Sequence, residues 1–434
     1  MKFIFADCLD CVDPEYDFLA DETHKNREPY WDDKFPHEYM DRPPYDGILV
    51  SRAIVGDAHF PGKYSEAQAM RFRREGARKF LRYPEERFPG SYMFGDCGAF
   101  QYRDFAEPPY TPEDILEFYQ DGQFSHGCSV DHIIFQFDSA LDEQGLFGSM
   151  VPEESRKRYE ITLANAERFL KLSRGLGKSF TPVGVVQGWS PKSMARAAQS
   201  LVGMGYTYIA IGGLVPLKVE AIHRAVEAVR GSVSLQTRLH LLGFAKVDSL
   251  GQFLKYKIHS FDTTSPLIRA FKDKSKNYYL PNGNGGIEYY IAIRIPQASD
   301  NKDVLKGIKS GRLMQEKLAV LEANALTSLR NYAESRKDLE KALNHVMEYT
   351  GTIFSEDTSD GHTVISDRAM NKLRKEYQRT LEARPWERCG CRVCRECEVE
   401  VIIYRSNNRN RRRGFHNLEV FYNHMETLKE NTNA

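Results

Sequence analysis

Two aspartates stand at the ends of short apolar runs and are each followed by turn residues. Asp96 closes a run that begins at Tyr92, and Asp262 closes a run that begins at Ile258 and is stopped by Pro266. An acid in such a place can cap the following helix. Two acids at comparable strand ends can instead act together as paired carboxylates. The pair therefore predicts paired-carboxylate chemistry at the rim of a barrel.

Four of the eight cysteines lie within nine residues of one another near the end of the chain: Cys389, Cys391, Cys394 and Cys397. In a cytoplasmic protein such clustering favours a metal over disulfides. Cys389, Cys391 and Cys394 form a tight knuckle, and the fourth ligand is either His416 or the local competitor Cys397. Three thiolates and one imidazole would close a tetrahedral site with no open position. We therefore predict a structural Zn2+ on Cys389, Cys391, Cys394 and His416.

A basic run lies between the knuckle and His416. Five arginines fall within nine residues: Arg405, Arg409, Arg411, Arg412 and Arg413. A solvated charge run is the plainer interpretation. Arginines held beside a zinc knuckle can also neutralise phosphates. We predict that these five side chains contact nucleic acid.

The bulk composition narrows the function classes. The chain has 434 residues, of which 41% are hydrophobic and 28% charged, with a formal net charge of +0. It is not a polycation, so any affinity for nucleic acid must come from local patches. No apolar run approaches the roughly 18 residues of a membrane span, and the first residues do not resemble a signal peptide. We expect a cytoplasmic protein with no membrane contact.

The elements that would position these residues read as alternating strands and helices. Near-continuous apolar runs are typical of parallel strands that are covered on both faces, and amphipathic segments separate most of them. Eight such runs predict an α/β fold, a (β/α)8 TIM barrel rather than an open doubly wound sheet. The predicted strands are Lys2–Ala6, Gly47–Ala53, Ser91–Gly95, His132–Phe137, Val183–Val186, Tyr206–Ile211, Leu239–Phe244 and Ile258–Phe261.

Catalytic groups of such a barrel lie at the carboxyl ends of its strands. Besides Asp96 and Asp262, the predicted strand ends carry Asp138, Gln187 and the glycine pair Gly212-Gly213 that precedes Leu214. Glycines close turns and aspartates cap helices, so each residue alone has a structural explanation. Polar residues at successive strand ends together favour an active site.

The chain changes character after the last predicted strand. We predict three consecutive domains: a barrel over residues 1–300, a helical insertion over 301–385 and a C-terminal zinc-binding subdomain over 386–434. A DNA-binding insertion and a dimerisation arm fit residues 301–385 equally well.

The ordered set of motifs resembles the tRNA-guanine transglycosylase superfamily, which is a (β/α)8 barrel with a late zinc subdomain. The segment Gly95–Gln101 resembles the family's Asp-Ser-Gly-Gly-Phe-Gln motif, and Ser260–Asp262 resembles its nucleophile strand. Phe137-Asp138, Gln187-Gly188, Gly212-Gly213-Leu214 and the zinc ligands resemble the remaining motifs in the same order.

The resemblance implies a role for each site residue. Asp262 would attack C1′ of a guanosine nucleotide and form a covalent glycosyl-enzyme, and Asp96 would serve as general base and general acid. The target base would have to be flipped out of a duplex. The residues that the resemblance places around the base are Asp138, Gln187, Gly213, Leu214, Phe100 and Gln101.

The segment after Asp262 indicates which nucleic acid is the substrate. The tRNA-modifying members continue with a Pro-Thr-Arg-x-Gly-Arg stretch, whereas this chain reads Ser265–Phe271 as SPLIRAF. Segments Asp10–Pro14 and Pro43–Gly47 resemble the DpdA-type branch, which inserts 7-deazaguanines into DNA. The resemblance therefore implies a pentosyltransferase that replaces guanine in DNA with a preQ0-like 7-deazaguanine base. The alternatives are a tRNA-guanine transglycosylase acting on tRNA and a catalytically silent zinc-bearing nucleic-acid-binding subunit. A helper ATPase and a homodimer stay open.

Overall fold

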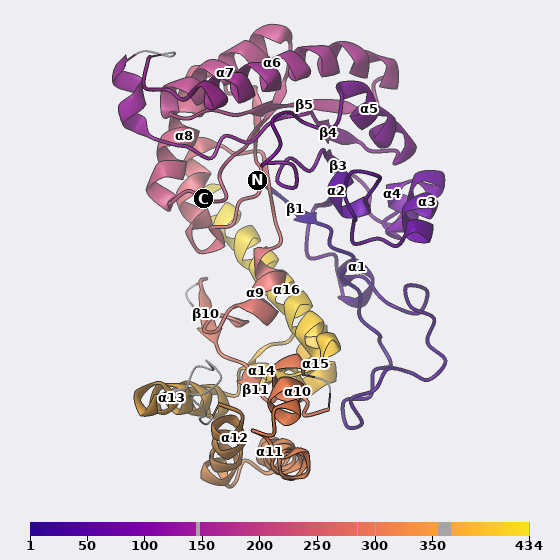
Figure 1. The fold of residues 1–434 in the computed structure, drawn as a ribbon, viewed down its shortest axis with the longest axis vertical. Coiled ribbons are helices and arrows are strands. Elements are labelled where there is room, and N and C mark those ends of the chain that lie inside the picture. The colour runs from indigo at the N-terminus through magenta and orange to yellow at the C-terminus, as the bar shows by residue number, and fades with distance from the viewer. Residues whose placement is uncertain (145–147, 284, 300, 355–365, 434) are drawn as a thin grey trace. The chain divides into compact units, whose positions relative to one another are not determined.

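The computed structural model describes residues 1–144, 148–283, 285–299, 301–354 and 366–433, which form two compact units (Figure 1). The first unit comprises residues 1–9, 45–265 and 428–434, and the second comprises 10–44 and 266–427. This division differs from the three consecutive domains expected from the sequence. The long crossover after the first strand belongs to the second unit, together with everything from Pro266 to Thr427.

The first unit is a closed barrel of eight parallel strands in sequence order, with β1 pairing with β8. The strands are β1 (Lys2–Ala6), β2 (Gly47–Ser51), β3 (Tyr92–Asp96), β4 (His126–Cys128), β5 (Thr181–Val186), β6 (Tyr208–Ile211), β7 (Arg238–Leu241) and β8 (Ser260–Thr263). Side chains such as Ile4, Phe94 and Val185 fill its interior without exposure to solvent. Burying each stabilises the fold by about 1.5–3 kcal/mol. The predicted (β/α)8 barrel is confirmed.

Helical segments alternate with these strands. They are α2 (Arg52–Val55), α3 (Glu66–Glu75), α4 (Ala77–Phe80), α5 (Pro112–Asp121), η1 (Ser139–Gln144), α6 (Glu153–Ser173), η2 (Arg174–Leu176), α7 (Pro191–Met204), α8 (Val219–Ser232) and η3 (Val247–Tyr256). The start and end of α7 follow from its sequence. The hydroxyl of Ser190 accepts the backbone N–H of Ser193, Pro191 occupies the first turn, and Gly205 ends the helix in the left-handed region at φ 113°.

The fourth strand is not where the sequence predicted it. The segment His132–Phe137 is an irregular loop, and β4 is the short segment His126–Cys128. A glycine inside β4 makes room for a neighbouring ring, because a Cβ at Gly127 would lie 2.4 Å from the ring of Tyr119. The sequence of the loop resembles a strand because its first residues, His132–Ile134, are apolar or buried without strand pairing, and two of their backbone N–H groups donate to side chains. The N–H of His132 donates to Thr162 Oγ1 at 3.0 Å.

The second unit is mainly helical. Its helices are α1 (Pro36–Tyr39), α9 (Ser265–Lys272, whose first residue belongs to the barrel unit), α10 (Lys302–Lys309), α11 (Gln315–Ser335), α12 (Leu339–Phe354), α13 (Asp367–Ala383), α14 (Pro385–Arg388), α15 (Arg392–Cys397), η5 (Glu398–Ile402) and α16 (Asn407–Asn433, which continues into the barrel unit). Its strands are β9 (Tyr278–Pro281), β10 (Ile287–Tyr290), β11 (Ile293–Arg294) and β12 (Ile403–Tyr404). The pair β9–β10 is antiparallel, and β11–β12 is parallel.

The region predicted as a helical insertion contains α10 to α13 and part of α14, and residues 355–365 within it lie outside the described residues. Helices α11, α12 and α13 pack side by side (Figure 1). Their apolar faces, with Leu318, Leu329 and Leu343 fully buried, account for the helical pattern of the sequence. Within the described ranges, no helix combines the length and the apolar character that crossing a bilayer requires.

Candidate active site and metal centre

A cavity of about 150 Å³ lies at the carboxyl ends of the barrel strands. It contains three carboxylates, from Asp96, Asp131 and Asp262, among mostly apolar walls. The other lining residues are Leu49, Ala99, Phe100, Ile133, Phe135, Gln187, Gly213, Val215, Pro216, Leu242 and Gly243. A cavity of this volume can enclose an aromatic ring such as benzene. The arrangement is suited to a planar ring that is held beside three acids.

Asp262 is the penultimate residue of β8, and one of its two carboxylate oxygens is held by hydrogen bonds. Its Oδ1 accepts the backbone N–H of Gly243 at 2.8 Å and lies 3.0 Å from His240 Nε2. Among the described residues, no group donates a hydrogen bond to Oδ2. The side chain is nearly buried yet lines the cavity. One oxygen is therefore anchored, and the other is available to a reactant.

Asp96 ends β3, opposite Ser51 of β2. Its Oδ2 accepts the backbone N–H of Gly98 at 3.0 Å. That turn requires glycine, since φ of Gly98 is +87° and a Cβ there would lie 2.5 Å from the Cβ of Ala53. Burial, reinforced by the negative charges of Asp131 and Asp262, raises the pKa of Asp96 to about 7. A carboxyl that titrates near neutral pH can both donate and accept a proton.

Asp131 is a buried acid of the cavity that the sequence prediction missed. It is 1% exposed, its Oδ2 accepts Gln187 Nε2 at 2.7 Å, and its Oδ1 accepts the thiol of Cys97 at 3.3 Å. Burial raises the pKa of Asp131 to about 6, although these two hydrogen bonds oppose the rise. Gln187 is itself oriented, because its Oε1 accepts the backbone N–H of Ile134 at 3.3 Å.

The predicted base-recognising acid Asp138 is not in this cavity. It is exposed, and its Oδ1 accepts the N–H of Ala140 at 2.9 Å, so it caps the short helix η1. The displaced strand explains the difference. Asp138 follows the apolar loop that was mistaken for a strand, whereas Asp131 comes three residues after the true end of β4. Placing the strand at His126 would have pointed to Asp131.

Some of the other predicted base-binding residues line the cavity, and others do not. Gln187, Gly213 and Phe100 line the cavity. Leu214 is buried beside it without lining it, and Gln101 is exposed. The structure thus brings together Asp96, Asp262, Gln187, Gly213 and Phe100, and it leaves Leu214 and Gln101 outside the lining.

Three exposed phenylalanines lie on the loops that follow β3 and β4, and two of them, Phe100 and Phe135, line the cavity and form its rim. Phe100 is 50% exposed, Phe105 44% and Phe135 39%. The rings of Phe100 and Phe135 meet edge to face at 6.5 Å, and the guanidinium of Arg103 lies 4.6 Å from the ring centre of Phe100. Exposed aromatic side chains are unusual on a surface and suit contact with flat, apolar groups.

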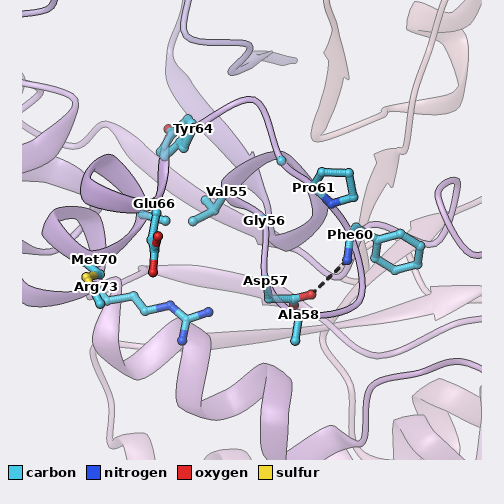
Figure 2. Close-up of a pocket in the computed structure, with 12 residues that line it drawn as sticks. Val55, Gly56, Asp57, Ala58, Phe60, Pro61, Tyr64, Glu66, Met70 and Arg73 are labelled. Carbon is cyan, nitrogen blue, oxygen red and sulfur yellow. Dashed lines mark hydrogen bonds between the residues drawn. The ribbon is translucent and has the colours of Figure 1, made fainter.

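A second hollow of about 470 Å³ lies between α2 and α3 (Figure 2). Two acids line it, Asp57 and Glu66, and Figure 2 shows Asp57 turned toward the backbone N–H of Phe60. The carboxylate also accepts Arg52 Nε at 3.0 Å, Tyr110 OH at 2.8 Å and the N–H of His59 at 2.8 Å. Asp57 is therefore occupied in holding its own loop, and the hollow offers no comparable set of reactive groups.

The second unit contains a buried cluster of three thiols and one imidazole: Cys389, Cys391, Cys394 and His416. The Nδ1 of His416 lies 3.6, 3.3 and 3.4 Å from the sulfurs of Cys389, Cys391 and Cys394. Bonds of about 2.3 Å to sulfur and about 2.1 Å to nitrogen at a tetrahedral angle place such donors roughly 3.6 Å apart. The donor set could therefore hold a metal ion of the zinc type.

The surroundings orient the imidazole for this role. His416 Nε2 lies 2.6 Å from the carbonyl oxygen of Tyr279, which fixes the proton on Nε2 and leaves Nδ1 as a ligand. The ring of Tyr278 stacks on His416 at 4.1 Å. Cys397, the alternative ligand, is not part of the cluster, and its sulfur lies 3.5 Å from Arg412 Nη1. The ligand choice left open by the sequence falls on His416.

The arginine run is buried instead of forming a surface for phosphates. Arg409 and Arg413 have no exposure and Arg412 only 2%. All but Arg405 lie in the first two turns of helix α16, and their guanidinium groups donate to other groups of the protein. Arg409 donates to Glu400 Oε2 at 2.7 Å, and Arg413 donates to the carbonyl oxygen of Ala270 at 2.6 Å.

The remaining arginines of the run are also engaged within the second unit. Arg405 donates to the carboxylates of Asp21 and Glu322. Arg411 donates to the carbonyl oxygen of Cys11 at 2.8 Å, and Arg412 donates to that of Asp13 at 2.7 Å. The predicted nucleic-acid contact of this run is therefore not supported by the structure. A charge run read from sequence alone does not reveal the acids and carbonyls that meet it from distant segments.

Comparison with known proteins identifies the family of the chain. No protein-family model matches the chain. A curated protein of Salmonella montevideo named DNA-guanine transglycosylase is 38% identical over 427 residues, which cover 98% of this chain and 97% of that protein. Identity of that degree over nearly the whole length of both proteins shows that the two belong to one protein family. The chain therefore belongs to the DNA-guanine transglycosylase family of enzymes.

Proposed function

We propose that this protein replaces guanine in DNA with a 7-deazaguanine base through a covalent glycosyl-enzyme on Asp262. The observation that carries the proposal is the placement of three carboxylates in one ring-sized cavity, with Asp262 anchored by Oδ1 alone. The name of the 38% identical relative supports guanine as the outgoing base and DNA as the polymer.

In the first displacement, Asp262 Oδ2 forms a bond to C1′ as the bond from C1′ to the guanine nitrogen breaks. The bonding pair passes to the guanine, which takes a proton from Asp96 as it leaves. A pKa of about 7 leaves a substantial fraction of Asp96 protonated at neutral pH, which this step requires. The product is an ester between Asp262 and the deoxyribose.

In the second displacement, the incoming base attacks C1′ through its ring nitrogen and gives its proton to Asp96. The bond from C1′ to Asp262 breaks, and its electron pair returns to the carboxylate. Asp96 is again protonated and Asp262 again ionised, so the two steps conserve protons and charge. Two displacements at one carbon retain its configuration, as in retaining glycoside hydrolysis.

Asp131 and Gln187 are the proposed readers of the base edge, in place of Asp138. The two side chains are hydrogen-bonded to one another, and both line the cavity. A carboxylate accepts hydrogen bonds from the amino and ring N–H groups that guanine and 7-deazaguanines share. A buried acceptor rejects bases without those donors, because it would be left unpaired.

The rim is the proposed contact surface for DNA, since the arginine run is turned inward. A base within a duplex cannot reach the cavity, so it must be flipped out. Phe100 and Phe135 offer ring faces on which unstacked bases can stack, and Arg103 beside Phe100 can meet a phosphate.

The metal of the second unit is proposed to be zinc in a structural role. The four donors leave no open coordination position for a substrate, and all four side chains are buried. The ion would fix α15 against α16 through Cys394 and His416. No chemical step is assigned to it.

Base exchange on two polymers tests the proposal. Labelled 7-deazaguanine is incubated with the protein and either duplex DNA or bulk tRNA, and label in each polymer is counted. We expect label in DNA, and release of an equal amount of guanine. Label entering tRNA alone would refute DNA as the substrate. No transfer to either polymer, together with tight DNA binding, would favour the silent binding subunit.

A further inference from the structure

We propose that His240 is a positioning residue for the nucleophile: it donates one hydrogen bond to Asp262 Oδ1 and so keeps Oδ2 turned toward C1′. The proposal rests on the proposed function, because it takes Asp262 to be the nucleophile. His240 lines no part of the cavity and is fully buried. It can act on the reaction only through Asp262.

A chain of contacts leads from His240 to two further buried side chains. His240 Nε2 lies 3.0 Å from Asp262 Oδ1, and its Nδ1 lies 2.6 Å from Ser260 Oγ. Ser260 Oγ is also hydrogen-bonded to the hydroxyl of Tyr208. His240, Ser260 and Tyr208 are each 0% exposed. Buried polar atoms of this kind need hydrogen-bond partners, and these three side chains supply them to one another.

The direction of each hydrogen bond follows from what its partners can do. Asp262 in its ionised form only accepts, so the proton of a neutral His240 sits on Nε2. Nδ1 then has a lone pair and accepts the hydroxyl of Ser260. Ser260 accepts the hydroxyl of Tyr208, because burial raises the pKa of Tyr208 and keeps its hydroxyl a donor. The chain therefore selects the one tautomer that can hold the carboxylate.

The strand register builds this arrangement. Ser260 and Asp262 are two residues apart on β8, so their side chains point to the same face. His240 of β7 pairs with Ser260 in the parallel ladder, which places the imidazole between the hydroxyl and the carboxylate. The ring is also stacked on Phe94 at 4.8 Å with an interplanar angle of 18°. It cannot rotate away without disturbing the barrel core.

The two donors on Oδ1 affect both displacements. Before the first, His240 and the N–H of Gly243 hold the carboxylate so that only Oδ2 faces the sugar. In the second, Asp262 leaves as a carboxylate, and the same donors stabilise the charge that returns to Oδ1. Loss of one such donor should therefore reduce turnover while leaving the binding of DNA and base nearly unchanged.

Three variants of the full-length protein separate positioning from packing. His240→Leu keeps the bulk and removes the donor, and His240→Gln keeps an N–H near the place of Nε2. His126→Leu is the matched control, because His126 also stacks on Phe94, at 5.4 Å, and its ring is hydrogen-bonded to Ser125 Oγ at 2.9 Å and not to Asp262. Base exchange is measured as kcat and as KM for duplex DNA, with thermal unfolding beside each.

We expect His240→Leu to lower kcat by about 10- to 100-fold, the effect of one lost hydrogen bond to a charged group, with KM changed less than about 3-fold. His240→Gln should recover most of that loss, and His126→Leu should turn over like the unmodified protein. Full turnover in His240→Leu would overturn the proposal, and so would a loss in kcat of the same size in His126→Leu.

Two further variants cover the other outcomes. Should His240→Leu fail to fold, Ser260→Ala decides, because it removes the donor that selects the tautomer. A lower kcat at unchanged KM in Ser260→Ala then supports the positioning role of His240, and an unchanged kcat overturns it. Asp262→Asn distinguishes this proposal from the proposed function. If Asp262→Asn retains full exchange, the nucleophile assignment itself fails. If Asp262→Asn is inactive while the His240 variants have normal kcat, only the positioning role of His240 fails.

Discussion

Asp96→Asn should make the barrel more stable at high pH while it abolishes base exchange. The pKa of Asp96 is raised from 3.8 to about 7, so the folded protein binds a proton more tightly than the unfolded chain. Between these values the native state holds more protons, and stability falls as pH rises. Above pH 7 the folded protein has lost the full amount of stability that the raised pKa of Asp96 costs. An amide cannot ionise, and its oxygen can still accept the N–H of Gly98.

The magnitude follows from the size of the shift. A rise of about 3 pKa units corresponds to at most about 4 kcal/mol at pH 8, at about 1.4 kcal/mol per unit. At pH 5 only the part between 3.8 and 5 applies, which is about 2 kcal/mol. The side chain keeps some exposure to solvent, and solvent screening reduces both values. The gain should nevertheless be larger at pH 8 than at pH 5.

Urea unfolding at the two pH values measures this difference. The chain has three tryptophans, Trp31, Trp189 and Trp386, of which only Trp189 lies in the barrel unit. In a background with Trp31→Phe and Trp386→Phe, the fluorescence of Trp189 reports on the barrel alone. A gain in Asp96→Asn that is equal at pH 5 and pH 8, or a loss of stability at pH 8, would refute the buried-acid reasoning.

Four further outcomes follow from the structure. Asp131→Asn should lower kcat/KM for exchange by 10-fold or more with the barrel still folded, and Asp138→Asn should leave it unchanged; the reverse pattern would return base reading to Asp138. Cys391→Ser should lose the one zinc per chain expected from metal analysis and lower the unfolding temperature of the second unit, because a structural zinc supplies on the order of 10 kcal/mol. Arg409→Ala should destabilise the second unit by about 1.5–3 kcal/mol, since Glu400 loses one of its two arginine partners and keeps only Arg330, while the salt dependence of DNA binding stays the same. Phe135→Ala should raise KM for duplex DNA several-fold and leave the thermal stability unchanged, as judged by exchange kinetics and calorimetry.

The sequence was a good guide where the chemistry depends on local pattern. Asp96 and Asp262 end apolar runs, and parallel strands bring such ends to one edge, so their meeting in one cavity was predictable. The spacing of Cys389, Cys391 and Cys394 likewise identified a metal-type knuckle. A local pattern is enough in both cases because the donors come from strand ends or from one turn.

The failures have a common physical cause, which is that distant segments decided the outcome. The loop His132–Phe137 is as apolar as a strand, but Thr162 and Gln187 take its backbone N–H groups. The arginine run meets Glu400 and backbone carbonyls that the local sequence does not reveal. His240 looked like one residue of a buried strand, because its contact with Asp262 depends on the register of β7 against β8.

Isolation of the glycosyl-enzyme tests the central claim most directly. The protein is mixed with duplex DNA in the absence of an incoming base, denatured rapidly and digested with protease and nuclease, and the peptides are analysed by mass spectrometry. We predict a deoxyribose adduct on the peptide that contains Asp262, absent in Asp262→Asn and removed when a 7-deazaguanine is added before denaturation. An adduct on Asp96 or Asp131, or continued exchange by Asp262→Asn, would contradict the account.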